Sequence, residues 1–124
     1  MKVLIADQSN VSRILIGEAL AEAQITHVEH APNGLEALNA VLTNDFDLAL
    51  IAWNLPKVLG IDILRHIRTI GMTMPVIMFS EKNHQQRISE AFKAGAQNIV
   101  SKPFTSVTVR KILEDTMEKA HLHA

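Results

Sequence analysis

The sequence predicts an α/β fold in which a five-stranded parallel sheet lies between two layers of helices, a doubly wound three-layer αβα sandwich. Two observations predict it. Short apolar runs alternate along the chain with segments in which apolar residues recur at helical spacing. The runs are apolar without alternation, which is typical of strands covered on both faces, and strands joined by helices run parallel.

Each of the five expected repeats consists of a strand followed by a helix. The strands are expected at residues 3–6, 48–52, 76–79 and 98–100, with a weaker candidate at 27–31. Helices with one buried face are predicted by the groups Ile16, Ala19, Leu20 and Ala23; Leu35, Leu38 and Leu42; Ile63, Leu64 and Ile67; Ile88, Ala91, Phe92 and Gly95; and Val109, Ile112, Leu113 and Thr116.

Composition indicates one ordinary globular domain spanning residues 1–124. The formal net charge of -1 gives no reason to expect a nucleic-acid or anionic membrane partner, and the absence of cysteine excludes disulfides and thiolate chemistry. No apolar run approaches the ~20 residues that span a bilayer, and the first residues do not form a signal peptide. We therefore expect a cytoplasmic protein.

Chemistry in such a fold is expected at the carboxyl ends of the strands. The residues there are Asp7 and Gln8, Ala52 to Asn54, Ser80 and Lys102. Phosphoryl transfer needs oxygen ligands for Mg²⁺, donors for the phosphoryl oxygens and a nucleophile. This set supplies an acid, amides, a hydroxyl and an ammonium group, but no good nucleophile and no second carboxylate.

A series of motifs in chain order carries a resemblance to a known family: Lys2-Val3-Leu4-Ile5-Ala6-Asp7, Arg13, Asn33-Gly34, Trp53-Asn54-Leu55-Pro56, Gly60, Pro75, Ser80, Ala94-Gly95-Ala96 and Lys102-Pro103-Phe104. Over essentially its whole length the chain resembles the receiver domain of response regulators, of the chemotaxis (CheY-like) type. The resemblance implies a flavodoxin-like (βα)5 fold and a signalling protein of two-component phosphorelays rather than an enzyme.

The resemblance also implies roles by position. Asp7 matches the first acid of a pair that binds Mg²⁺, and Asn54 matches the residue whose backbone carbonyl reaches the metal. Ser80 matches the switch hydroxyl, and Lys102 matches the lysine that binds the phosphoryl oxygens and precedes a proline, usually through a cis bond.

Four positions depart from the family pattern. Gln8 stands where the second acid is expected, Ala52 where the phosphoacceptor aspartate is expected, Leu59 at a frequent acid, and Ile99 at an aromatic that often moves with the switch hydroxyl. A methyl group cannot attack phosphorus or bind a cation. We therefore expect a pseudo-receiver that is not phosphorylated at the usual site, with weak or absent Mg²⁺ binding and no tightly bound cofactor.

No other acid is expected to substitute. At ~3.3 Å per residue, Asp47 lies ~16 Å from position 52, at the opposite end of the strand, and Asp45 lies beyond it. Asp62 falls on the third helix.

Two alternatives stay open. The chain could be an ordinary phospho-accepting response regulator that carries an engineered Asp→Ala change at 52, although the departures at Gln8, Leu59 and Ile99 favour a natural degenerate receiver. It could also be a flavodoxin-like protein that binds a small ligand, but the segment Gln8-Ser9-Asn10-Val11 lacks the glycine of a phosphate-binding loop.

The resemblance places a partner surface on the fourth helix, fifth strand and fifth helix. Here it would include Lys82, His84, Ile99, Thr105 and Val107. A receiver that stands alone must act by contacting another protein, namely a histidine kinase, a phosphotransfer protein or a downstream target. The same surface allows a homodimer.

Overall fold

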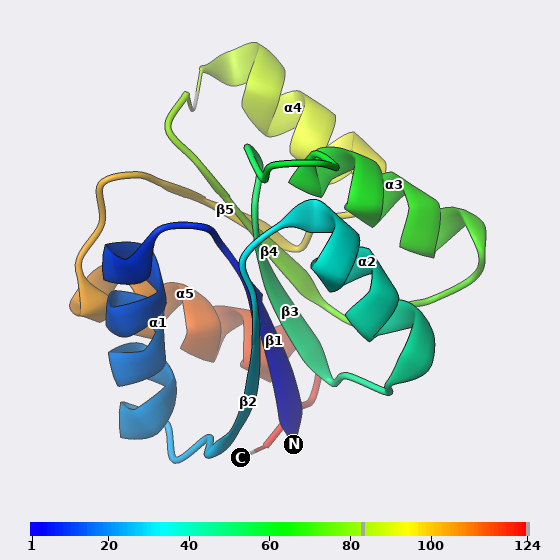
Figure 1. Cartoon of the computed structure of the whole chain (residues 1–124). Helices are drawn as coiled ribbons and strands as arrows, with labels where there is room; N and C mark the ends of the chain where they lie inside the picture. The colour runs from blue at the N-terminus through cyan, green and yellow to red at the C-terminus, as the bar shows by residue number, and fades with distance from the viewer. Residues whose placement is uncertain (83, 124) are drawn as a thin grey trace.

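The computed structural model describes residues 1–82 and 84–123, and its strands and helices alternate along the chain (Figure 1). The strands differ from the expected ranges by at most one residue at an end. The elements are β1 (Lys2–Ala6), α1 (Asn10–Glu22), β2 (His27–Ala31), α2 (Gly34–Thr43), β3 (Leu48–Ala52), α3 (Gly60–Thr69), β4 (Val76–Ser80), α4 (Gln85–Ala94), β5 (Asn98–Ser101) and α5 (Ser106–Lys119).

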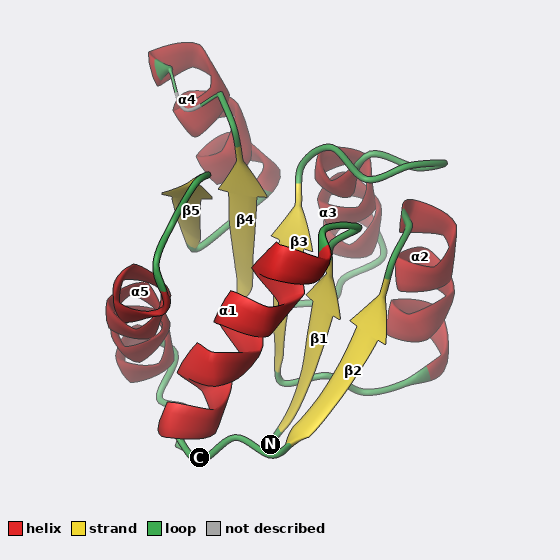
Figure 2. Cartoon of the chain, turned by 60° about the vertical axis from the view of Figure 1, so that its left-hand side comes forward, coloured by secondary structure: helices red, strands yellow, loops and turns green. Residues whose placement is uncertain are grey.

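The five strands form one parallel sheet in the order β2-β1-β3-β4-β5, which confirms the predicted fold class. Helices α1 and α5 cover one face of the sheet, and α2, α3 and α4 cover the other (Figure 1). All strand arrows in Figure 2 point the same way, so their carboxyl ends share one edge of the sheet.

Burial on both faces explains why the central strands are apolar except at their ends, where Lys2 begins β1 and Ser80 ends β4. Leu4 and Ala6 of β1 enter the core under α2, α3 and α4, whereas Val3 and Ile5 enter the core under α1 and α5. Successive side chains of a strand point to opposite faces, so each strand contributes to both cores. All five residues of β3 are buried.

The predicted buried face of the second helix is wrong. Leu35 and Leu42 are 55% and 49% exposed, and Leu38 is only partly buried. The buried residues of α2 are instead Gly34, Ala37 and Val41. A similar error affects α4, where Phe92 is 47% exposed.

Close packing at the start of α2 accounts for this rotation. The N–H of Gly34 donates to the carbonyl of Pro56 at 2.8 Å, and a Cβ at residue 34 would lie 1.9 Å from the carbonyl oxygen of Val58. The helix therefore approaches the chain after β3 through its smallest residue. Small residues at Gly34 and Ala37 permit this approach, and a leucine stripe on that face would prevent it.

Arg68 joins three segments at the far end of α3. Its guanidinium donates to the carbonyl oxygens of Met72, Met74 and Gly95 at 2.9, 2.7 and 2.9 Å. Burial lowers the pKa of Arg68 from its ordinary value. A planar group with five donors can satisfy several carbonyls at once, so Arg68 ties the chain before β4 to the end of α4.

Replacing Arg68 with alanine is expected to lower the free energy of unfolding by about 2 kcal/mol, because half-buried carbonyls lose charge-assisted hydrogen bonds. Urea denaturation measures the change. Arg65→Ala on the same helix is the matched control, since Arg65 is exposed and pairs with Asp62 and Glu90 at the surface; we expect less than about 1 kcal/mol there. Equal losses in the two variants would contradict a special role for Arg68.

Candidate functional site

The strand register brings the predicted site residues to one edge of the sheet. Ala6 pairs with Ile51, so Asp7 follows beside Ala52, at the point where the strand order reverses between β1 and β3. Ser80 pairs with Ser101, so Lys102 follows beside Ser80. This crevice between strand ends is the usual ligand position in doubly wound sheets.

Asp7 is buried and fully engaged. Its side chain is 2% exposed, and Oδ2 accepts a hydrogen bond from Nζ of Lys102 at 2.7 Å. Oδ1 accepts the N–H of Ser9 at 2.9 Å, while the backbone carbonyl of Asp7 accepts from Arg13. Of the two adjacent positions Asp7 and Gln8, only Asp7 carries a carboxylate, and its charge is neutralised by Lys102.

Lys102 and Ser80 lie on neighbouring loops that the sheet fixes in place. The Lys102–Pro103 peptide bond is cis, as the resemblance implied. The ring of Phe104 packs on Phe79 with centroids 5.2 Å apart, which anchors the loop after β5 against β4. Ser80 is buried, and its Oγ accepts the N–H of Lys82 at 3.2 Å, so it also closes a turn.

Ala52 ends β3 at the edge of a small cavity of about 70 Å³. The N–H of Gly60 donates to the carbonyl of Trp53 at 2.8 Å, and a Cβ at residue 60 would lie 1.9 Å from the carbonyl oxygen of Ala52. The start of α3 therefore closes tightly over the end of β3. The cavity is lined by Gln8, Ser9, Ala52, Asn54, Phe79, Ser80, Glu81 and Lys102.

A larger hollow, of about 570 Å³, lies between Phe46, Pro75 and Asn98 near the amino ends of the strands. It is remote from the convergent polar groups. We place the candidate site at the small cavity, because its lining includes all the predicted pocket residues except Asp7, which forms an ion pair with Lys102 of the lining.

Asp47 and Asp62 do not line the cavity, in agreement with the prediction that neither substitutes for an acceptor. Asp47 accepts the N–H of Lys2 at 2.7 Å, at the amino end of β1. Asp62 pairs with Arg65 on α3. The sequence reasoning did, however, miss Glu81, which directly follows Ser80 and lines the cavity.

Arg87 was also missed, because it lies on α4, seven residues after the strand end. Its Nη1 donates to Oγ of Ser80 at 3.2 Å, and its guanidinium carbon lies 4.1 Å from the centroid of the Trp53 ring. Trp53, which directly follows β3, is 3% exposed beneath this guanidinium. No sequence spacing indicates such a contact, since it depends on how α4 is placed.

The comparisons with known proteins agree with this architecture. The family model for the response regulator receiver domain matches residues 3–114. The chain belongs to the response regulator receiver domain family. It is 32% identical to chemotaxis protein CheY-3 of Vibrio cholerae over 121 residues, which is 96% of this chain and 93% of the relative. It is also 32% identical to chemotaxis protein CheY of Pseudomonas aeruginosa over 123 residues, 98% of this chain and 99% of the relative.

Solved receivers share the fold. The chemotaxis response regulator CheY4 of Vibrio cholerae superposes with a TM-score of 0.83 at 27% identity, covering 93% of this chain and 97% of that one. The chain is thus a CheY-like receiver of two-component signalling. In residues 1–82 and 84–123, no helix has the length and apolar character needed to cross a membrane.

The residues expected at the receiver's partner surface lie on three elements. Lys82 and His84 are exposed before and at the start of α4, and Nδ1 of His84 accepts the N–H of Arg87 at 3.3 Å. Thr105 caps α5, and Val107 on that helix is 60% exposed. Ile99 on β5 is half-buried against the core.

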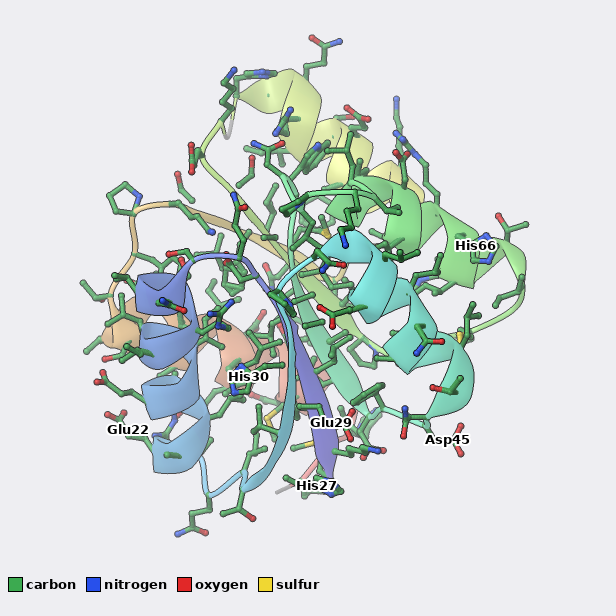
Figure 3. All side chains as sticks on the ribbon, in the orientation of Figure 1. Glu22, His27, Glu29, His30, Asp45 and His66 are labelled. Atoms are coloured by element: carbon green, nitrogen blue, oxygen red, sulfur yellow. The ribbon has the colours of Figure 1, made fainter. Side chains whose placement is uncertain are left out.

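Histidines and acids elsewhere on the receiver are spread over several elements (Figure 3). Within the described part of the chain, no three His, Cys, Asp or Glu residues are grouped as metal ligands. The labelled residues are Glu22 on α1, His27, Glu29 and His30 on β2, Asp45 between α2 and β3, and His66 on α3.

Replacing Lys102 with methionine is expected to lower the free energy of unfolding by about 3 kcal/mol, because the buried charge of Asp7 loses its partner. Chemical denaturation measures the loss. The second change Asp7→Asn removes that charge and should recover much of the stability in the double variant. Additive losses from the two single changes would show that the ion pair contributes nothing specific.

Proposed function

We propose that this receiver signals by binding protein partners in a two-component pathway without accepting a phosphoryl group at residue 52. The observation that carries the proposal is the methyl group of Ala52 at the end of β3, facing the cavity that Ser80 and Lys102 line. A phosphoacceptor at this strand end must be a nucleophile, and alanine has none.

The charges around the cavity support the same proposal for Mg²⁺. The carboxylate of Asp7 is bound by Lys102, and Gln8 and Ala52 bring no charge. A hard divalent cation would have to displace an ammonium group from the buried carboxylate, with Glu81 and the backbone carbonyl of Asn54 as further ligands. We propose that Mg²⁺ binds weakly or not at all.

We further propose that Ala52 is native. Gln8, Leu59 and Ile99 depart from the family pattern together with Ala52, and a single engineered change would not alter them. Reading the codon for residue 52 in the source genome tests this point directly. An aspartate codon there would support the alternative of a working receiver with a blocked acceptor.

The proposed partners are a histidine kinase, a phosphotransfer protein or a downstream target. The surface proposed for them is formed by Lys82, His84, Ile99, Thr105 and Val107. The exposure of Val107 supports this choice, because a partner that covers this side chain removes apolar surface from water, which favours binding. A homodimer through the same surface is a variant of this proposal.

Incubation with acetyl phosphate and Mg²⁺ is expected to leave the intact mass of the protein unchanged. Ala52→Asp is expected to gain the mass of one phosphoryl group in part of the molecules, because it restores a carboxylate nucleophile beside Ser80 and Lys102. Ala52→Asn is the matched control and should gain nothing. Phosphorylation of the unaltered chain at Glu81, Ser80 or another residue of the cavity would overturn the proposal.

Trp53 is the only tryptophan and lies next to residue 52, so its fluorescence reports on cation binding at the cavity. Titration with millimolar Mg²⁺ is expected to leave this fluorescence unchanged, because the cavity lacks ligand charge. The variant Gln8→Asp with Ala52→Asp should show a saturable response, because two added carboxylates supply the missing ligand charge. A saturable response of the unaltered chain that Glu81→Gln abolishes would show instead that Glu81 completes a metal site.

A further inference from the structure

Helix α4 is held to the rest of the molecule by few apolar contacts. Ala91 is its only fully buried residue, whereas α1 and α5 each bury four. Phe92 is 47% exposed, and the exposed ion pair between Glu90 and Arg65 joins α4 to α3. A helix with so little buried surface opens locally at a low free-energy cost unless polar contacts hold it.

Arg87 provides such a contact in the first turn of α4. Its guanidinium covers the ring of Trp53 at 4.1 Å and donates to Oγ of Ser80 at 3.2 Å. A guanidinium stacked on a buried indole gains both from the attraction of the cation to the ring and from desolvation of the ring face. Within the described residues, no carboxylate forms an ion pair with Arg87.

Both groups that Arg87 contacts are rigid. The N–H of Trp53 donates to the carbonyl of Phe79 at 2.7 Å, which extends the ladder between β3 and β4. Ser80 is the last residue of β4 and is buried. The first turn of α4 is therefore fastened to two strand ends at the rim of the cavity.

We infer that Arg87 is a latch that holds the first turn of α4, and with it the neighbouring part of the partner surface, against Trp53 and Ser80. The inference deepens the proposed function and rests on it in one respect. A receiver that takes no phosphoryl group at residue 52, and has Ile99 in place of an aromatic, needs another contact between the cavity and α4. Arg87 supplies a contact that does not depend on phosphorylation.

The single tryptophan makes the latch measurable. Removal of the guanidinium in Arg87→Ala should uncover Trp53, shift its emission to longer wavelength and increase its quenching by acrylamide. Amide exchange in the first turn of α4 should become about tenfold faster, the size expected from the loss of one cation–π contact and one hydrogen bond. Gln86→Ala, an exposed neighbour on the same helix, should change neither signal.

Two further variants separate the contacts. Ser80→Ala should keep the emission of Trp53 while speeding exchange by less than Arg87→Ala does. Arg87→Lys keeps the charge but loses the planar group, so it should give an intermediate shift. If Arg87→Ala does not fold, the emission and exchange of Arg87→Lys decide the question.

The latch would be overturned if Arg87→Ala had the same tryptophan emission and amide exchange as Gln86→Ala. If Arg87→Ala does not fold, unchanged emission and exchange in Arg87→Lys would overturn it. The experiment uses no phosphodonor. Phosphorylation of the unaltered chain would therefore overturn the proposed function alone, while the fluorescence and exchange results would still decide the latch.

Discussion

The parallel register of β1, β3 and β4 is the constraint on which the site depends. Because Ala6 pairs with Ile51 and Ala52 pairs with Phe79, the residues that follow these strands meet at one edge of the sheet. The alternation of buried side chains fixes this register, since a shift by one residue would turn Val3 and Ile5 toward the wrong core. The chemistry at the edge is therefore determined by packing several residues away.

Within that frame, one ion pair sets the electrostatics of the cavity. The ion pair between Lys102 and Asp7 joins the residue that follows β5 to the residue that follows β1, and it neutralises the charge of the carboxylate. The resemblance implies a pair of acids and an acceptor aspartate at this edge, and of these positions only Asp7 carries a carboxylate here. Gln8 and Ala52 bring no charge to the cavity, Glu81 and Lys102 line it, and the guanidinium of Arg87 lies at its border on Ser80.

Much of the fold could be predicted from the sequence, because uninterrupted apolar runs and helical spacing report burial directly. The predicted cavity residues also converge, since the strand ends of a parallel sheet have only one place to meet. The exposure of Leu35 and Leu42 on α2 could not be predicted in the same way. Its orientation depends on the close approach of Gly34 to Val58, a contact between segments that spacing within the helix does not encode.

The positions of Arg87 and Glu81 at the cavity could not be predicted from the sequence, for related reasons. Glu81 follows Ser80 directly, but whether it faces the cavity depends on the turn that Ser80 closes with Lys82. Arg87 reaches Trp53 because the first turn of α4 lies beside the residue that follows β3. Both contacts are set by loop geometry, whereas the identity of residue 52 as alanine needs no structure at all.

The most direct test of the central claim is transfer of a radiolabelled phosphoryl group from an autophosphorylated histidine kinase of the same organism. The account predicts that no label reaches the unaltered chain, although the kinase passes label to a receiver that has an aspartate at this strand end. Label appearing on the unaltered chain, in a bond within the cavity, would contradict it.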